Sequence, residues 1–193
     1  MIAVVHYNAG NIRSVLNALS RLECEATLTA DPDELRAADK VIFPGVGEAG
    51  STMRHLRANG LDSVLRSLQQ PFLGICLGLQ LMCAHTEEGN TDGLGIFDVP
   101  VRKFPAQDKV PHVGWNDFTQ VSGPLFKGLP PTDDMYFVHS YFAELNPSQT
   151  VAVTEYITPF SAALHRDNFY ATQFHPEKSA DAGEQLLRNF LAL

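Results

Sequence analysis

Short apolar runs alternate with amphipathic stretches of helical period along the first half of the chain. The runs at residues 2–7, 26–29, 40–43 and 71–75 predict buried strands. Apolar side chains at helical spacing follow three of these runs, at 12–22, 51–68 and 77–84, with a break expected near Gly60. A short helix is expected after Asp31, which precedes a proline and two acidic residues. This strand–helix rhythm predicts a parallel sheet covered on both faces.

The second half of the chain reads as strands joined by turns. Apolar stretches at 99–104, 113–121, 135–138, 151–156, 161–165 and 169–174 predict strands, with a hairpin turn at 166–168. A helix from 180 to 191 is expected to close the fold. We therefore predict an α/β fold with a mainly parallel central sheet and antiparallel strands in the second half. At 193 residues, the chain is expected to form a single domain, 1–193.

The composition of the chain limits the kinds of partner that it is expected to bind. The formal charge is −8 and no Lys/Arg cluster is present, which disfavours nucleic-acid binding. No apolar run has the length of a membrane span, and the first residues lack the basic region of a signal peptide. The three cysteines, Cys24, Cys76 and Cys83, are too few for a disulfide framework. We expect a cytoplasmic protein whose partner is a small molecule or another protein.

Cys76 lies between Gly74 and Gly78, after an expected strand and before an expected helix. A sharp strand-to-helix corner requires glycines at such positions, because a Cβ atom there would collide with a neighbouring strand or helix. The helix N-terminus favours the thiolate, so Cys76 is in a nucleophile's position. Taken alone, the motif is equally compatible with a buried cysteine that acts as a small apolar residue.

A cysteine nucleophile needs a base and a group that orients the base, and His175-Pro176-Glu177 supplies both. If residue 174 ends a strand beside the Cys76 strand, His175 projects from the same edge of the sheet. The His-x-Glu spacing also occurs in zinc deaminases, but their Pro-Cys-x-x-Cys companion is missing here. We therefore predict a Cys76–His175–Glu177 triad and no metal.

The stretch 45–50 matches the G-x-G-x-x-G pattern of dinucleotide sites. It follows the third expected strand and not the first, and Glu48 would place a negative charge near a pyrophosphate, which disfavours that use. A glycine-rich turn beside the Cys76 corner could instead point a backbone N–H at the carbon that the thiolate attacks. Together with the N–H of Leu77, it would form an oxyanion hole.

The corner 74–80 and His175-Pro176-Glu177 resemble the motifs of the class I glutamine amidotransferases. Further stretches at 7–11, 43–47, 111–116, 136–141 and 175–179 narrow the resemblance to the glutaminase subunits of imidazole glycerol phosphate synthases, enzymes of histidine biosynthesis. His6 and Asn8 depart from that pattern, because an acidic residue and a glycine are usual there. The resemblance implies a three-layer, flavodoxin-like fold and hydrolysis of L-glutamine to glutamate and ammonia through a cysteinyl thioester, without a cofactor.

The resemblance also implies roles for individual residues. The oxyanion would be held by Leu77 and by a backbone N–H at Val46 or Gly47, after a peptide rearrangement in the loop 44–47. The residues implied to bind the amino and carboxylate groups of glutamine are Gly47, Gln80, Glu88, Ser140 and Tyr141. Without the resemblance, Glu88 would be interpreted as a solvated loop acid.

The implied partner is a (β/α)8 barrel cyclase subunit, which would form a heterodimer with this chain and receive its ammonia to make imidazole glycerol phosphate and aminoimidazole carboxamide ribotide. The positions that match the subunit interface are Asn11, Trp115, Tyr136 and Lys178. From sequence, two alternatives remain: a glutaminase subunit of another biosynthetic synthase, or a non-catalytic regulatory relative.

Overall fold

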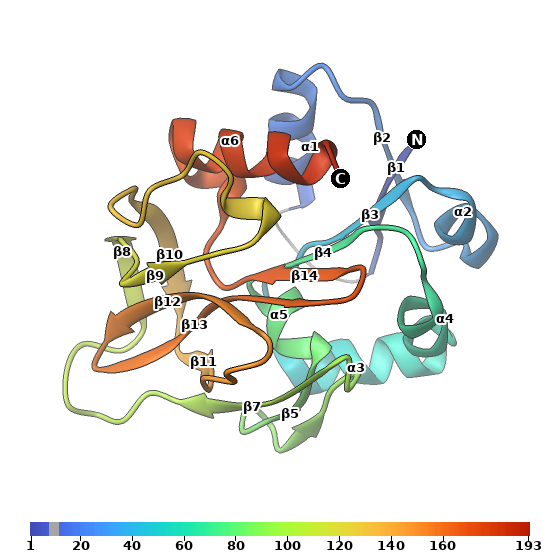
Figure 1. Ribbon diagram of the computed structural model, residues 1–193. Coiled ribbons are helices and arrows are strands. Elements are labelled where there is room, and N and C mark those ends of the chain that lie inside the picture. The colour runs from blue at the N-terminus through green and yellow to red at the C-terminus, as the bar shows by residue number, and fades with distance from the viewer. Residues whose placement is uncertain (8–11) are drawn as a thin grey trace.

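A parallel sheet forms the centre of the computed structural model, which describes residues 1–7 and 12–193 (Figure 1). Its strand order is β2-β1-β3-β4-β14, and each neighbouring pair is parallel. The bounds of these strands are β1 (Ile2–Val5), β2 (Ala26–Thr29), β3 (Lys40–Phe43), β4 (Phe72–Ile75) and β14 (Phe169–Thr172).

Helices cover both faces of this sheet, as the apolar runs predict. Figure 1 shows α1 (Ile12–Arg21) and α6 (Ala180–Leu191) together on one face. The helices α2 (Pro32–Ala37), α3 (Ala49–Ala58), α4 (Leu61–Ser67) and α5 (Leu77–Met82) pack on the other. Alternate residues of β1 enter opposite cores, Ile2 and Val4 towards α1 and α6, Ala3 and Val5 towards α2 to α5. The result is a three-layer fold.

The second half extends the sheet with antiparallel strands. β13 pairs antiparallel with β14 and with β11, and β11 pairs antiparallel with β7. β5 then pairs parallel with β7, and β6 pairs antiparallel with β5 at the edge. The bounds are β5 (Cys83–Thr86), β6 (Thr91–Asp92), β7 (Phe97–Lys103), β9 (Gln120–Val121), β11 (Tyr141–Ala143), β12 (Thr150–Tyr156) and β13 (Thr158–Arg166). A separate pair joins β8 (His112–Asn116) to β10 (Met135–His139), and η1 (Pro124–Phe126) and η2 (Pro176–Lys178) are short 3-10 turns.

The predicted fold class is confirmed, and two predicted elements are corrected. The helix expected over 77–84 ends at Met82, because Cys83 begins β5 and pairs with β7. The strand expected over 113–121 is two strands in different sheets, since β8 pairs with β10 while β9 pairs with β12. Within residues 1–7 and 12–193, no helix is both long enough and apolar enough to cross a membrane.

The carboxyl ends of β3, β4 and β14 meet at one edge of the sheet. Gly74 lies beside Phe43, and Ile75 lies beside Thr172. The N–H of Cys76 then donates a hydrogen bond to the carbonyl of Thr172, at 2.7 Å. Three segments far apart in sequence therefore begin together at this edge: the loop after Phe43, the corner at Cys76 and the chain that leads to His175.

Candidate active site

Cys76 sits at a strained corner between β4 and α5. Its φ of 54° and ψ of −107° are unusual for a residue with a side chain. A Cβ atom on Gly78 would lie 2.2 Å from the carbonyl oxygen of Phe43, and one on Gly74 would lie 2.3 Å from the sulfur of Met82. The flanking glycines are therefore required by close approach, as the sequence predicts, and the corner leaves Cys76 7% exposed.

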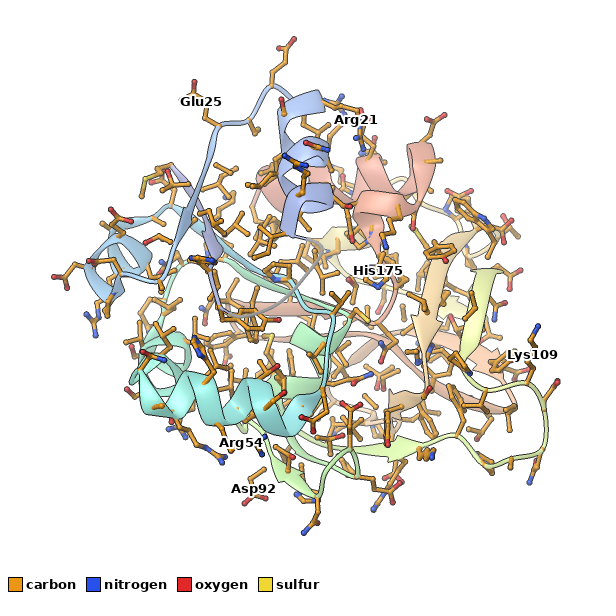
Figure 2. All side chains as sticks on the ribbon, turned by 180° about the vertical axis from the view of Figure 1, so that it is seen from behind. Arg21, Glu25, Arg54, Asp92, Lys109 and His175 are labelled. Atoms are coloured by element: carbon orange, nitrogen blue, oxygen red, sulfur yellow. The ribbon has the colours of Figure 1, made fainter. Side chains whose placement is uncertain are left out.

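His175 and Glu177 form a buried pair. Nδ1 of His175 lies 2.8 Å from Oε1 of Glu177. The backbone of His175 is fixed from two sides: its N–H donates to the carbonyl of Tyr136, at 2.9 Å, and its carbonyl accepts from Ser179 Oγ, at 2.6 Å. Figure 2 shows His175 in the interior, whereas Arg54 and Lys109 lie at the periphery.

Electrostatics couple His175 to Cys76. Burial alone would lower the pKa of His175, but the charge of Cys76, followed by the hydrogen bond and charge of Glu177, raises it above the ordinary value. The other ring nitrogen, Nε2, is buried and makes no conventional hydrogen bond within the residues described. An imidazolium beside a cysteine is the arrangement that activates cysteine nucleophiles in general.

A cavity of about 320 Å³ opens in front of Cys76. It has the size of a small-molecule site and is built by five segments of the chain. Its lining residues are Val46, Gly47, Cys76, Leu77, Gln80, Glu88, Pro111, Val138, His139, Ser140 and Tyr141. Every residue that the sequence predicted for the oxyanion hole or for substrate binding lines this cavity.

The loop after β3 is held against the corner, but Leu77 is not free to bind an oxyanion. Its N–H donates to the carbonyl of Gly45, at 3.3 Å. Tyr7 donates from its hydroxyl to the carbonyl of Pro44, at 2.5 Å, and burial followed by the charge of Cys76 raises the pKa of Tyr7. In this conformation, a backbone carbonyl therefore occupies one of the two N–H groups expected for the oxyanion hole.

The glycine-rich stretch 45–50 does not have the form of a phosphate site. The Glu48 carboxylate caps α3 by accepting from Gly50 and Ser51, at 2.8 and 2.7 Å. Glu88 Oε2 accepts from the N–H of Ala49, at 2.9 Å. Two carboxylates thus fill the helix N-terminus where a pyrophosphate would bind. Among the residues described, no group of three or more His, Cys, Asp or Glu side chains is placed to hold a metal ion.

The family model "Glutamine amidotransferase class-I" matches residues 3–193 of the chain. The chain belongs to the class I glutamine amidotransferases. A relative from Bacteroides thetaiotaomicron named "Imidazole glycerol phosphate synthase subunit HisH" is 60% identical over 100% of this chain and 99% of that protein. One of the same name from Neisseria meningitidis serogroup B is 44% identical and covers 98% of each chain.

Solved structures of lower sequence identity share the fold. The crystal structure of a glutamine amidotransferase superposes with a TM-score of 0.77 at 20% identity, over 100% of this chain and 98% of that one. PurLQS from Thermotoga maritima gives a TM-score of 0.73 at 15% identity, over 99% of this chain and 97% of that one. The central sheet and its helical layers are therefore those of this amidotransferase family.

The residues predicted at an amidotransferase subunit interface gather on one surface. Trp115 on β8 contacts Tyr136 on β10 edge to face, with ring centroids 5.9 Å apart. The Lys178 Nζ lies 5.9 Å from the centre of the Tyr136 ring. Trp115 is 54% exposed despite its size. Asn11, the fourth predicted residue, lies outside the described residues.

Two groups that support this amidotransferase site were not singled out by sequence reasoning. Ser179 bonds both the carbonyl of His175 and the N–H of Tyr136, so it ties the predicted base to the predicted interface strand. Gln173 is fully buried, and its amide nitrogen lies 3.7 Å from the Cys76 sulfur. Its position directly before Phe174 and His175, next to the motif that supplies the predicted base, was the available signal.

Proposed function

We propose that this chain is the glutaminase subunit of an imidazole glycerol phosphate synthase, with Cys76, His175 and Glu177 as its catalytic triad. The names of relatives with 60% and 44% identity over nearly the full chain support the assignment. The observation that carries it is the buried His175–Glu177 pair, which is electrostatically coupled to Cys76 beside a small-molecule cavity.

The first half of the reaction forms a thioester. The Cys76 thiolate attacks the side-chain amide carbon of glutamine, and the carbonyl electron pair moves to the oxygen. As the tetrahedral intermediate collapses, the carbon–nitrogen bond breaks and the leaving nitrogen takes a proton from the His175 imidazolium. The products of this half are ammonia, a γ-glutamyl thioester on Cys76 and a neutral His175.

The second half releases glutamate. Neutral His175 takes a proton from a water molecule whose oxygen attacks the thioester carbon, and collapse expels the Cys76 thiolate. Glu177 accepts the hydrogen bond from Nδ1 and keeps Nε2 available for both proton transfers. Glutamate leaves, and the thiolate–imidazolium pair is restored.

Oxyanion stabilisation requires a change in the loop 44–47. The Gly45 carbonyl, which now accepts from Leu77, must turn away so that the Leu77 N–H and a backbone N–H at Val46 or Gly47 point at the oxyanion. Gly47 already has a φ of 136°, a conformation that few other residues adopt, and among the described residues a Cβ atom there would meet a single atom within 4 Å, on Leu77. Backbone freedom at this position supports a local rearrangement.

The cavity wall offers groups for the amino-acid end of glutamine. Glu88 is half-buried, and its carboxylate supplies a negative charge for the substrate ammonium. The backbone at Gly47, Ser140 and Tyr141 would hold the carboxylate. Both amide N–H groups of Gln80 bond within the protein, so any contact with glutamine falls to its carbonyl oxygen.

The partner in this proposal is a (β/α)8 barrel cyclase that binds over the surface of Trp115, Tyr136 and Lys178, with Asn11, and receives the ammonia. We further propose that residues 1–193 act as one domain and that the heterodimer functions in the cytoplasm. A cytoplasmic location suits Cys24, Cys76 and Cys83, which form no disulfide with one another.

An electrophilic glutamine mimic tests the nucleophile. Peptide mass spectrometry after labelling should find one adduct, on Cys76, and the Cys76→Ala variant should carry none. Cys83→Ala is the matched control, because Cys83 is a buried cysteine that does not line the cavity. Its adduct should remain on Cys76. A label on Cys24 or Cys83 in the native protein, with Cys76 unmodified, would overturn the triad.

The partner assignment needs a separate experiment. Glutamate formation by the free chain should be slow and should rise strongly when a cyclase of the synthase and its ligand are added. Equal rates with and without the cyclase would contradict the assignment. Activation by the partner of a different glutamine-dependent synthase, and not by the cyclase, would favour the alternative that the chain serves another biosynthetic pathway.

A further inference from the structure

Gln173 has no role in the mechanism above, yet it touches the reacting atom. Its side chain is fully buried, and Nε2 lies 3.7 Å from the sulfur of Cys76, within hydrogen-bond range for sulfur. The backbone N–H of Gln173 donates to the carbonyl of Ala162, at 2.8 Å, and so fixes the residue beside the corner. A buried amide in this position either only packs against its neighbours or donates a hydrogen bond to the Cys76 sulfur.

Neighbouring hydrogen bonds decide which end of the amide faces the sulfur. The carbonyl of Tyr141 can only accept, so the Gln80 group 2.9 Å away from it is the NH2 group. The same NH2 group lies 3.0 Å from Gln173, which must present its oxygen to Gln80. The NH2 group of Gln173 is therefore the end that points at Cys76.

His139 supports the same orientation of the Gln80 and Gln173 amides. Its Nδ1 lies 2.7 Å from the same Tyr141 carbonyl, which must accept from it as well. The carbonyl thus binds two donors, and it cannot release Gln80 without leaving a buried amide unsatisfied. A rotation of the Gln173 amide by 180° would set two NH2 groups against each other. The donor orientation is the one that satisfies every group.

The protonation state of the sulfur decides what the donor does. As a thiol, Cys76 is placed to donate to the carbonyl of Val138, at 3.8 Å. As a thiolate it has no proton to give, and an N–H donor then stabilises the negative charge. A fixed donor on one side of the sulfur favours the charged form over the neutral form.

We propose that Gln173 is a hydrogen-bond donor to the Cys76 thiolate, held in that orientation by Gln80 as a positioning residue. The proposal rests on the proposed function, because it assigns Gln173 to the same nucleophile. In this proposal the thiolate is stabilised by three groups: His175, the helix N-terminus and Gln173. Gln173 lies two residues before the proposed base, His175.

The test measures thiolate formation without glutamine. The free chain is treated with iodoacetamide at pH values from about 4 to 9, and peptide mass spectrometry follows alkylation of Cys76. Gln173→Glu keeps an acceptor for Gln80 but loses the donor, and Gln173→Leu loses both. In Gln173→Leu the acid-side inflection should move up by about one unit, which slows alkylation about tenfold at lower pH. In Gln173→Glu it should move up at least as far, because the new carboxylate also repels the thiolate. Gln80→Leu should shift the inflection of Cys76 alkylation in the same direction, but by a smaller amount.

Controls separate this effect from damage to the fold. Gln185→Glu and Gln185→Leu make the same chemical changes on the exposed side of α6, where Gln185 bonds only Asn189 at 2.9 Å, and they should leave the inflection unchanged. Thermal unfolding establishes that each variant is folded, and Gln173→Glu, which has the native shape, covers the case in which Gln173→Leu does not fold.

An inflection unchanged in Gln173→Glu overturns the proposal. Failure of the proposed function looks different: the chain with its cyclase would form no glutamate, while the alkylation profiles would still report the contribution of Gln173.

Discussion

His175 and Glu177 are joined by a 2.8 Å hydrogen bond across a single intervening proline, and each side chain is only 1% exposed. The 3-10 turn Pro176–Lys178 makes this possible, because it folds the Glu177 carboxylate back onto the imidazole. Pro176 fits the start of the turn, since its φ is already restricted and it needs no N–H partner there. The proposed base and its proposed orienting acid are therefore supplied by three consecutive residues.

Glu177→Gln should lower the pKa of His175, because the variant loses a negative charge while the burial that disfavours the imidazolium remains. In the native chain, the raised pKa keeps His175 protonated at pH values above the ordinary 6.5, so deprotonation of His175 limits activity on the alkaline side. In the variant, the alkaline limit of activity should therefore move to a lower pH, and kcat should fall by about 10²-fold or more. The measurement is the pH profile of glutamate formation with the partner bound.

The matched control for that change is Glu184→Gln on α6, where the carboxylate bonds Arg188 at an exposed position. Its profile should coincide with that of the native chain. If Glu177→Gln also kept the native alkaline limit, the carboxylate would not act on His175.

Gly78→Ala should destabilise the fold by about 3 kcal/mol and reduce the reactivity of Cys76. The added Cβ would lie 2.2 Å from a backbone carbonyl oxygen of β3, so either the strand or the corner must move. Gly60→Ala is the control: its φ of 69° is strained, but no atom of residues 1–7 and 12–193 would lie within 4 Å of the added Cβ, and the expected cost is about 1–2 kcal/mol. Urea unfolding measures both. Equal costs would mean that the corner tolerates the Cβ.

The parallel half of the fold was predictable because its strands are buried on both faces. Runs such as Lys40–Phe43 and Phe72–Ile75 are almost wholly apolar, and each is bounded by turn or helix signals. β5 and β11 carried no such signal. β5 begins directly after α5 with no turn residue between them, and Tyr141–Ala143 is only three residues long. Their pairing with β7 depends on contacts distant in sequence, which periodicity does not report.

Residue type and spacing predicted which side chains meet at the site, but not how their hydrogen bonds are shared. The approach of residues 76 and 175 follows from two parallel strands that end at one edge. The Leu77 N–H already donates a hydrogen bond to the carbonyl of Gly45, at 3.3 Å. This bond depends on how closely two backbone segments approach, which the sequence pattern does not report. The orientation of the Gln173 amide likewise depends on the carbonyl of Tyr141, on a different strand.

Two neutral histidines should make the fold acid-sensitive. Nδ1 of His112 lies 3.1 Å from Nε2 of His139, and the His112 ring stacks on Tyr156 with centroids 4.0 Å apart. Burial lowers the pKa of His112 to about 4, and burial, with smaller contributions from the charges of His112 and His175, lowers that of His139 to about 3. Because the unfolded chain takes up these protons near pH 6.5, stability should fall between pH 6.5 and about 4.

The expected slope is up to about 1.4 kcal/mol per pH unit for each histidine, measured by urea unfolding at pH 7 and pH 5. His139→Gln should be less stable than the native chain at pH 7 but should lose less on acidification. His6→Gln, at an exposed histidine, should keep the native slope. A His139→Gln slope equal to the native one would show that His139 is not held neutral.

Trp115→Ala should weaken binding of the cyclase partner while leaving the free chain nearly as stable as before. The indole is 54% exposed and Val113, two residues earlier on β8, is 56% exposed, so both project from the outer side of the strand next to Tyr136. Exposed aromatic side chains of this kind commonly dominate an interface. Truncation should raise Kd about 30-fold, or about 2 kcal/mol, in calorimetric titration. Leu145→Ala is the control, at a 48% exposed apolar residue beyond β11, and it should leave Kd unchanged. A Trp115→Ala variant with native affinity would place the cyclase on another surface.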